Sequence, residues 1–399
     1  MSLRIRRLAA VAGPLSLVLA LAACGGGGTA DNSPATAAPA GLSAMAALGE
    51  KIFADASLSA SGRQSCASCH DPAFGHSPAN GLAAQFGGAD ATLQGTRKAP
   101  GIRYLAANSA FFFAADGTPT GGFFWDGRAR TFAEQATEPF LNSFEMANVS
   151  KAAVIAKLAA APYAADFRKL FGDNVFADVD GAYLRLSLAV QQYEREDTEF
   201  NAYSSKYDAF LRGKVSLGEQ ELRGLALYNS PAKGNCTACH PSSRGTNGSP
   251  PLFTDFSYDN LGVPRNPELQ RNADPAYFDL GLCQRPDLAQ RGDLCGAFKV
   301  PSLRNVALRQ ALFHNGRFKT LKDALGFYVQ RDTAPGKWYP TDSAGVIRKF
   351  DDLPVEFRVN VNTSEAPYNR RPGDAPALSD AEIDDVIAFL KTLNDGYTP

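Results

Sequence analysis

The feature that most constrains this chain is a five-residue pattern that occurs twice. Residues 66–70 read C-A-S-C-H and residues 236–240 read C-T-A-C-H. C-x-x-C-H is typical of c-type haem attachment, because two thiols one turn apart can bond to the two vinyl groups of one porphyrin. The imidazole that follows then lies under the iron as an axial ligand. The sequence therefore predicts two covalently bound haem c groups, held by Cys66, Cys69, His70, Cys236, Cys239 and His240.

A Cys-x-x-Cys pair can also be a redox-active dithiol or half of a zinc site. Neither alternative explains why a histidine directly follows both pairs in a chain that has only four histidines. We therefore favour haem attachment at both motifs.

Three of the seven cysteines lie outside these motifs. Cys283 and Cys295 are twelve positions apart in a loop-like stretch. If the protein is exported, a local disulfide is expected between them, and two free thiols are the alternative.

The N-terminus resembles an export signal. Arg4, Arg6 and Arg7 precede a largely apolar stretch that ends in L-A-A-C at Cys24. This pattern is typical of a secretory signal peptide with a bacterial lipobox. We expect residues 1–23 to be a lipoprotein signal peptide, Cys24 to carry lipid, and residues 24–41 to be a flexible tether. The protein would then be periplasmic or otherwise extracytoplasmic and held at a membrane by its lipid; cleavage elsewhere, with loss of Cys24, is the alternative.

The composition is that of a soluble globular protein. Of 399 residues 45% are apolar, and 40 basic against 41 acidic side chains give a net charge of −1. This balance excludes a broad basic surface for nucleic acid. Beyond the signal region, no apolar run is long enough to span a bilayer.

The two haem motifs divide the chain into similar halves. A helical stretch precedes each motif, which suggests a duplicated unit with one haem each. We expect a mainly α fold of two cytochrome c-like domains, 42–205 and 206–399. Gly- and Pro-rich stretches at 71–124 and 240–310 are expected to be long loops around the cofactors.

The sequence also indicates where several of the helices lie and where they begin. Helical patterns occur at 150–171 and 181–195. Ser216 with Glu219, and Ser379 with Glu382, form capping-box patterns that predict the start of a helix.

Few side chains are available as sixth haem ligands. Apart from tyrosines, the candidates are Met146, His76 and His314. His76 is six residues after His70, so it reaches about 20 Å at most, against a detour of roughly 25 Å around the porphyrin. We therefore expect His76 to bind a propionate or a backbone group. A haem that lacks a protein ligand on one side can bind peroxide or oxygen, which points to an enzyme.

Longer stretches make the chain recognisable. Residues 124–146 read F-W-D-G-R-A-R-T-F-A-E-Q-A-T-E-P-F-L-N-S-F-E-M, and residues 298–318 read F-K-V-P-S-L-R-N-V-A-L-R-Q-A-L-F-H-N-G-R-F. Together with both C-x-x-C-H motifs and F-T-D-F-S-Y-D-N-L-G-V-P at 253–264, they resemble the bacterial di-haem cytochrome c peroxidase superfamily, especially its MauG-like branch. The resemblance covers about residues 42–395.

The resemblance implies roles for the residues that match. The N-terminal haem would be the peroxidatic site, and the C-terminal haem would store or relay an oxidising equivalent. Trp125 would lie between the haems. Glu145 would move a peroxide proton, Gln135 would orient the peroxide, and Pro139 would shape the pocket wall. Without the resemblance, isolated residues of these types are more often structural or surface residues.

The stretch L-K-D-A-L-G-F-Y at 321–328 places Tyr328 where ordinary di-haem peroxidases have a methionine ligand. The MauG-like branch has a tyrosine there, so the resemblance implies His240 and Tyr328 as ligands of the second iron. An anionic phenolate would favour ferric over ferrous iron. The alternative is an ordinary core tyrosine. His314 matches a family histidine near this haem, where it would support the site.

Two departures from the family pattern matter. The family's inter-haem calcium uses an asparagine side chain where this chain has Lys98. Arg309 and Ala311 match the carbonyl ligands and still have carbonyls. Calcium is therefore doubtful, and Lys98 would supply positive charge instead. Gly234 stands where MauG has the surface tryptophan of its electron path, which suggests a different substrate.

The leading hypothesis is a MauG-like di-haem peroxidase that uses hydrogen peroxide to oxidise a partner protein or a small electron donor. A conventional peroxide-detoxifying cytochrome c peroxidase is the nearest alternative. A di-haem electron carrier is the alternative from another class.

Overall fold

The computed structural model describes residues 41–399. The signal peptide, Cys24 and all but the last residue of the tether lie outside the described residues and stay predictions. Within residues 41–399, no helix is both long and apolar enough to cross a membrane.

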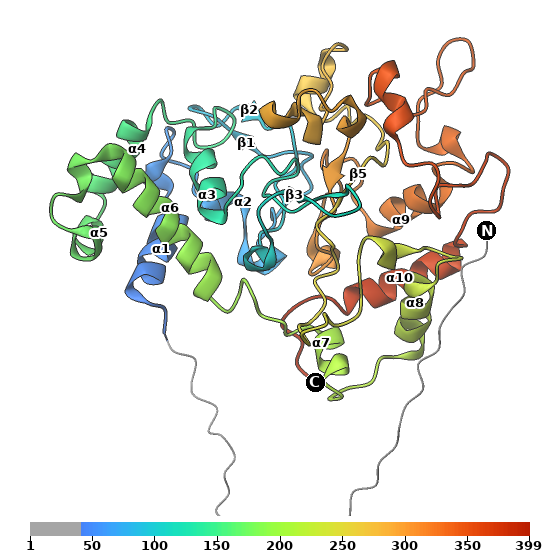
Figure 1. Cartoon of the computed structure of the whole chain (residues 1–399), viewed down its shortest axis with the longest axis horizontal. Helices are drawn as coiled ribbons and strands as arrows, with labels where there is room; N and C mark the ends of the chain where they lie inside the picture. The colour runs from blue at the N-terminus through green and yellow to red at the C-terminus, as the bar shows by residue number, and fades with distance from the viewer. Residues whose placement is uncertain (1–40) are drawn as a thin grey trace, which may run out of the picture. The chain divides into compact units, whose positions relative to one another are not determined.

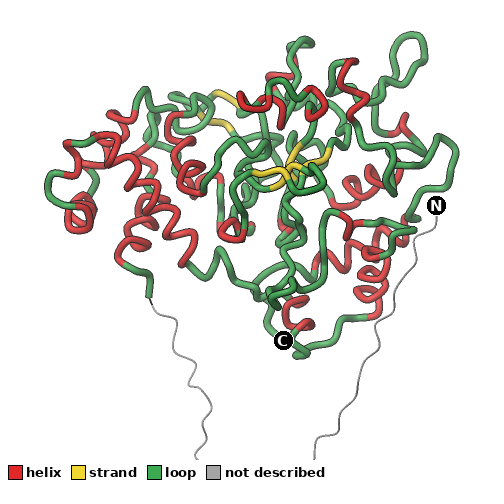
Figure 2. The backbone as a smooth tube through the Cα atoms, in the orientation of Figure 1, coloured by secondary structure: helices red, strands yellow, loops and turns green. Residues whose placement is uncertain are grey.

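Helices are the main regular secondary structure of the described chain, and long loops connect them (Figures 1 and 2). The longer helices are α1 (Ala44–Ala54), α3 (Phe132–Leu141), α4 (Lys151–Ala160), α5 (Ala164–Phe171), α6 (Val179–Glu196), α8 (Glu219–Asn229), α9 (Leu321–Gln330) and α10 (Asp380–Lys391). The shorter α2 (Cys66–Cys69) and α7 (Lys206–Leu211) complete the α-helices found in this part of the chain. The expected mainly α fold is confirmed.

Strands are limited to three two-residue antiparallel pairs in the described residues. They are β1 (Phe86–Gly87) with β2 (Leu93–Gln94), β3 (Phe112–Phe113) with β4 (Pro119–Thr120), and β5 (Tyr258–Asp259) with β6 (Phe298–Lys299). They lie in the loops between the two groups of helices (Figure 2). The long loops expected at 71–124 and 240–310 are thus present.

Each half of the described chain packs one helix onto another through a glycine. A Cβ atom on Gly49 of α1 would lie 1.9 Å from the carbonyl oxygen of Ala189 in α6. A Cβ atom on Gly224 of α8 would lie 2.0 Å from that of Asp385 in α10. In both cases, the helix that precedes a haem motif lies against the last helix of its half. The same packing in both halves is what a duplicated unit would produce.

The two largest apolar cores follow the same division. One contains buried side chains from residues 48–200, including Leu48, Phe140 and Leu186. The other contains buried side chains from residues 207–393, including Phe327 and Phe389. The domain boundary between residues 205 and 206 stays a prediction.

The helix signals were partly correct. Ser379 and Glu382 cap α10 as expected. The capping box expected at Ser216 and Glu219 is wrong. Helix α8 begins with Gly218 as its N-cap, because the Glu221 carboxylate accepts a hydrogen bond of 2.6 Å from the Gly218 N–H.

The single helical pattern at 150–171 is two helices, α4 and α5, separated at residues 161–163. Pro162 lies in this break. Because proline has no N–H to donate, it disfavours a continuous helix.

Cys283 and Cys295 form a disulfide, as expected. Both are buried in a small apolar cluster with Leu282, Leu288 and Leu294.

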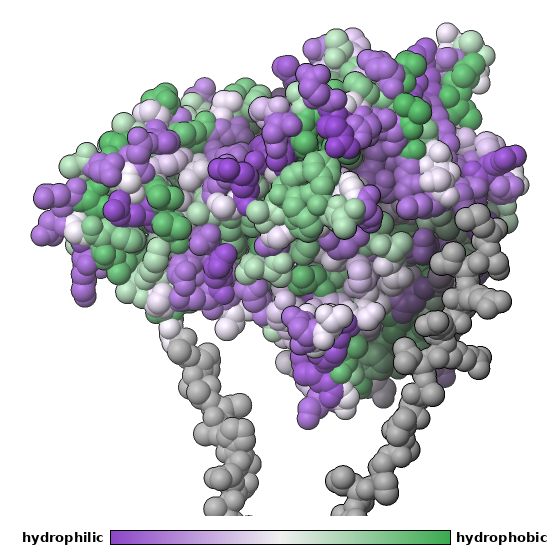
Figure 3. All heavy atoms as spheres, in the orientation of Figure 1, coloured by the Kyte–Doolittle hydropathy of each residue, from purple (hydrophilic) through white to green (hydrophobic). Residues whose placement is uncertain are grey.

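On the face drawn in Figure 3, apolar side chains are interspersed with polar ones.

Candidate active site

Two cavities contain the residues singled out from the sequence. The first, which we call the N-terminal cavity, is lined by Cys66, Cys69, His70, Trp125, Gln135, Pro139 and Glu145. The second, the C-terminal cavity, is lined by Cys236, Cys239, His240, His314 and Tyr328. The fold therefore brings each predicted set of site residues to a common space.

The first motif orients its histidine through local backbone bonds. Residues Cys66–Cys69 form the one-turn helix α2, and the His70 N–H donates to the Cys66 carbonyl over 3.0 Å. His70 Nδ1 lies 3.1 Å from the His76 carbonyl oxygen. Because a carbonyl can only accept, Nδ1 is the donor and Nε2 keeps its lone pair for a metal. Burial lowers the pKa of His70 to about 4, which favours this neutral form.

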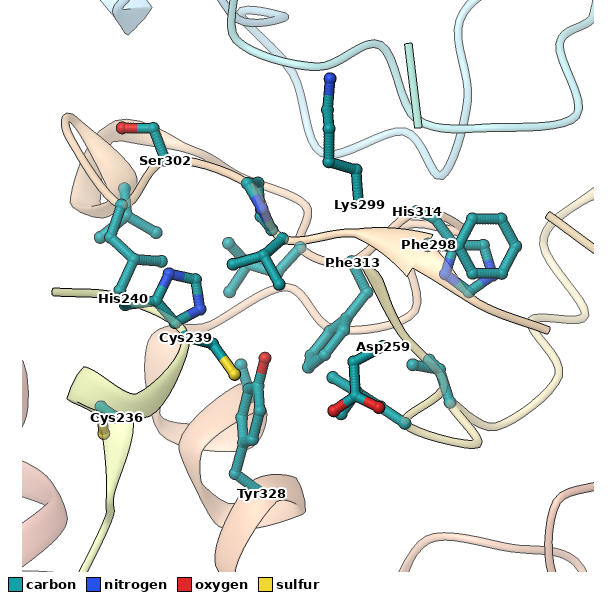
Figure 4. Close-up of a pocket in the computed structure, with 18 of the residues that line it drawn as sticks. Cys236, Cys239, His240, Asp259, Phe298, Lys299, Ser302, Phe313, His314 and Tyr328 are labelled. Carbon is teal, nitrogen blue, oxygen red and sulfur yellow. The ribbon is translucent and has the colours of Figure 1, made fainter. Parts of the chain in front are cut away.

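The second motif repeats this arrangement. Cys236 begins a 3₁₀ turn, and the His240 N–H donates to the Cys236 carbonyl over 2.8 Å. His240 Nδ1 donates to the Phe253 carbonyl over 2.7 Å, which again leaves Nε2 free. Burial also lowers the pKa of His240. Figure 4 shows its imidazole and the Cys239 sulfur bordering the same space.

The thiols fit haem attachment better than redox or zinc chemistry. None of the four motif cysteines is part of a disulfide. Burial raises the pKa of Cys69 to about 11 and also raises that of Cys66. Reactive Cys-x-x-Cys pairs and zinc ligands need lowered pKa values. Within residues 41–399, no cluster of three or more His, Cys, Asp or Glu side chains could hold a metal ion.

His76 lies on the side of the proximal histidine. Its side chain is fully buried, and its ring centroid lies 4.0 Å from that of Phe200. Its Nδ1 accepts a hydrogen bond of 3.1 Å from Arg103, while its carbonyl binds His70. Within residues 41–399 the His76 side chain has no backbone partner, because Arg103 binds its Nδ1 and its Nε2 is unpartnered; a propionate partner stays a prediction. Its ring is not among the groups lining the N-terminal cavity.

Helix α3 and the loop after it build the other wall of the N-terminal cavity. Gln135 and Pro139 lie on α3, and Glu145 follows in the loop. The Glu145 carboxylate accepts a hydrogen bond of 2.7 Å from the Asn142 amide. Burial raises the pKa of Glu145 to about 7, so this carboxyl can hold or release a proton near neutral pH. The neighbouring Met146 is buried and also lines the cavity.

The two cavities share a wall. Six residues line both: Lys98, Pro100, Ile102, Phe124, Trp125 and Gln135. The Trp125 indole N–H donates to the Lys98 carbonyl over 2.8 Å, and the Trp125 carbonyl accepts from the Lys299 N–H over 2.8 Å. Trp125 is therefore fixed at the boundary between the two predicted haem positions.

Tyr328 and His314 differ in their orientation. Figure 4 shows the Tyr328 hydroxyl pointing into the space that His240 and Cys239 border. Burial raises the pKa of Tyr328. The His314 ring instead stacks on Phe298, with centroids 3.5 Å apart and an interplanar angle of 8°. His314 thus packs into the wall of the cavity.

Comparisons with known proteins agree with this arrangement. A family model described as di-haem cytochrome c peroxidase matches residues 43–216. The methylamine utilization protein MauG of Paracoccus denitrificans is 36% identical over 371 residues, which cover 88% of this chain and 89% of that protein. The chain belongs to the di-haem cytochrome c peroxidase family.

Other members of the family are also similar. Cytochrome c551 peroxidase of Nitrosomonas europaea is 31% identical, with 70% of this chain and 71% of that protein covered. The crystal structure of the diheme peroxidase BthA from Burkholderia thailandensis matches with a TM-score of 0.81 and 40% identity, covering 88% of this chain and 86% of that one. The chain is therefore a haem peroxidase with two c-type haems and hydrogen peroxide as its oxidant.

Sequence reasoning missed several residues of this di-haem peroxidase. Asn142 was not identified, although N-x-x-E places its amide within reach of Glu145. Glu194 on α6 lines the N-terminal cavity with an unpartnered, buried carboxyl oxygen, and burial raises its pKa to about 8. Lys299 lines the C-terminal cavity from β6. A single Glu or Lys in these segments carries no distinctive sequence signal.

Proposed function

We propose that this di-haem peroxidase is MauG-like: it uses hydrogen peroxide to oxidise a partner protein or a small electron donor, and His240 and Tyr328 ligate its second haem iron. The observation that carries the proposal is the Tyr328 hydroxyl, which points into the cavity of the second C-x-x-C-H motif (Figure 4). No hydrogen bond from this hydroxyl to another group occurs within residues 41–399, so it is available as a ligand. A phenolate ligand would lower the reduction potential of its haem.

The N-terminal cavity supplies the acid–base chemistry of peroxide reduction. The two haems supply the redox chemistry when they are bound through their cysteines and histidines. Reduction of one hydrogen peroxide to two waters takes up two protons and two electrons. Glu145 accepts the proton of the incoming peroxide at its carboxylate and returns it to the oxygen that leaves as water. Asn142 holds one Glu145 oxygen over 2.7 Å, which fixes the direction of the other.

Other groups of the same cavity orient the oxidant. Gln135 lines this cavity from α3, where its amide would hydrogen-bond a small oxygen ligand. Pro139, one turn later on α3, contributes a rigid apolar wall. Trp125 lies on the boundary of both cavities, where its indole would carry oxidising equivalents from one haem to the other.

The cell compartment and the oxidised partner also belong to the proposal. Export and lipid attachment at Cys24 would place the enzyme outside the cytoplasm, at a membrane surface. MauG relatives are named for methylamine utilization. Gly234 offers no aromatic side chain for an electron path like that of MauG, so we assign this enzyme a different partner.

Spectra of the diferric protein before and after addition of peroxide test the proposal. We expect one high-spin and one low-spin haem, and a direct reaction of the diferric protein with peroxide. A protein that reacts only after one haem has been reduced would be a conventional cytochrome c peroxidase. A wholly low-spin spectrum would contradict an open N-terminal haem.

A further inference from the structure

Three cationic side chains line the C-terminal cavity and have no acidic partner. They are Lys98, Lys299 and Arg309. No ion pair within residues 41–399 joins any of them to a carboxylate. Lys98 is 4% exposed, and its Nζ donates to its neighbour's carbonyl, that of Ala99, over 2.9 Å. Lys299 Nζ donates to the Gly122 carbonyl over 2.6 Å.

Arg309 is the least satisfied of the three. Its Nη2 donates to the Arg304 carbonyl over 3.0 Å, but its Nε is buried with no hydrogen-bond partner. Burial lowers the pKa of Arg309 to about 10. Burial and the neighbouring Arg309 together lower the pKa of Lys98 to about 7. Charged groups in these positions are unfavourable unless an anion joins them.

Nearby arginines show that the chain pairs other cations in this region. Arg97 lies 2.6 Å from a carboxylate oxygen of Asp126 and 2.6 Å from one of Asp279. Arg128 pairs with Asp126 and Glu138. Lys98, Lys299 and Arg309 line a cavity and have no such carboxylate within the described chain. The occupant of that cavity can supply the anion that they lack.

Haem provides anions of the right chemistry. Each haem carries two propionate carboxylates on the edge opposite its vinyl groups. The cysteines fix the vinyl edge, so the propionates must lie away from the motif. Lysine and arginine side chains bind carboxylates through charge-assisted hydrogen bonds.

We propose that Lys98, Lys299 and Arg309 form a carboxylate-binding cluster that holds haem propionates where the two cavities meet, in place of a divalent cation. The inference rests on the proposed occupancy by two haems. Lys98 lines both cavities and serves both haems, whereas Lys299 and Arg309 line only the C-terminal cavity. Positive charge beside the propionates disfavours the more highly charged oxidised iron, so the cluster raises the reduction potential of each haem that it contacts.

The test measures the midpoint potential of each haem by spectroelectrochemistry in the purified di-haem protein. Lys98→Met is expected to lower both potentials, and Lys98→Arg to restore them. Lys299→Met and Arg309→Met are expected to lower only the potential of the C-terminal haem. Lys322→Met is the matched control, because Lys322 is exposed and paired with Asp384 at the surface. Its potentials should equal those of the wild type.

Two results would overturn the cluster. One is unchanged potentials in both Lys98→Met and Arg309→Met variants that carry two haems. The other is one tightly bound calcium per chain, whose removal with EDTA shifts the wild-type potentials and whose return as calcium chloride restores them. If Lys98→Met fails to retain haem, the Lys299 and Arg309 variants decide. The proposed function is tested on the wild-type diferric protein with peroxide, whereas the cluster is tested by the potentials of the variants, so the two failures are distinguishable.

Discussion

The Trp125 indole N–H donates a hydrogen bond of 2.8 Å to the Lys98 carbonyl oxygen. Lys98 in turn donates its backbone N–H to the His314 carbonyl over 2.7 Å. Segments far apart in sequence are therefore joined at the wall between the cavities. The orientation of the indole depends on this bond, because its other polar contact is made by its backbone.

Replacing Trp125 by phenylalanine should disturb this wall. Trp125→Phe keeps an aromatic ring but leaves the Lys98 carbonyl without its donor, at a cost of about 1–3 kcal/mol of unfolding free energy. We also expect slower redox exchange between the haems, measured by stopped-flow spectroscopy after addition of peroxide. Trp338→Phe is the control, because the Trp338 Nε1 is buried without a partner and its loss removes no hydrogen bond. Equal exchange rates in both variants would show that Trp125 has only a packing role.

Glu145→Gln should retain both haems but slow the reaction with peroxide by roughly 10²–10⁴-fold, the usual effect of losing a general acid or base. Burial raises the pKa of Glu145 to about 7, and the carboxylate form accepts the peroxide proton. The wild-type rate should therefore rise as the pH increases through about 7, and the variant should lack this step. Glu134→Gln on α3 is the control, since Glu134 pairs with Arg130 at the surface. Unchanged kinetics in Glu145→Gln would remove this residue from the mechanism.

Glu194→Gln should change how stability depends on pH. Burial raises the pKa of Glu194 from 4.5 to about 8 in the folded protein. Between these values the folded state holds a proton that the unfolded state releases, so the wild type loses stability as the pH rises from 4.5 to about 8. The variant cannot ionise and should lack this part of the slope.

Thermal unfolding at about pH 5 and about pH 9 measures the difference between wild type and Glu194→Gln. The stability of the wild type relative to the variant should be greater at the lower pH. The same pH dependence in both proteins would mean that the bound haem gives Glu194 a partner that keeps its pKa near the ordinary value.

Features that depend on residues close together in the sequence could be predicted, whereas contacts between distant segments could not. The C-x-x-C-H motifs predicted the thiols and proximal histidines correctly as neighbours, because one helical turn sets their spacing. The short reach of the chain after His70 predicts that His76 is not the sixth ligand, and its ring does not line the N-terminal cavity. The resemblance implied that Trp125 and Lys98 lie between the haems, but the hydrogen bonds that join residues 98, 125 and 299 could not be predicted, since these residues are far apart in the sequence.

The wrong start of helix α8 and the overlooked Glu194 also depend on contacts that the local sequence pattern does not show. The Ser216 and Glu219 pattern satisfied the capping rule, but Glu221 reaches the Gly218 N–H and begins the helix two residues later than the pattern implied. Glu194 was overlooked because a glutamate on a helix is usually solvated. Only the packing of α6 shows that its side chain is 4% exposed and turned to the cavity.

Replacement of Tyr328 tests the proposed MauG-like chemistry against that of a conventional cytochrome c peroxidase. It lies on α9, and its ring centroid is 5.4 Å from that of Phe313 and 6.1 Å from that of Tyr368. If its oxygen binds the iron opposite His240, an anion stabilises the ferric state, and reduction becomes difficult. Tyr328→Met replaces this anion with a neutral thioether, so it should raise the potential of the C-terminal haem. The N-terminal haem should still bind peroxide, but the C-terminal haem should no longer share its oxidising equivalents.

Tyr368→Phe is the control, because Tyr368 lines the same cavity beside Tyr328. A Tyr328→Met variant that keeps the wild-type potential would make Tyr328 a packing residue and favour a conventional cytochrome c peroxidase, and a spectral change in Tyr368→Phe alone would identify Tyr368 as the ligand.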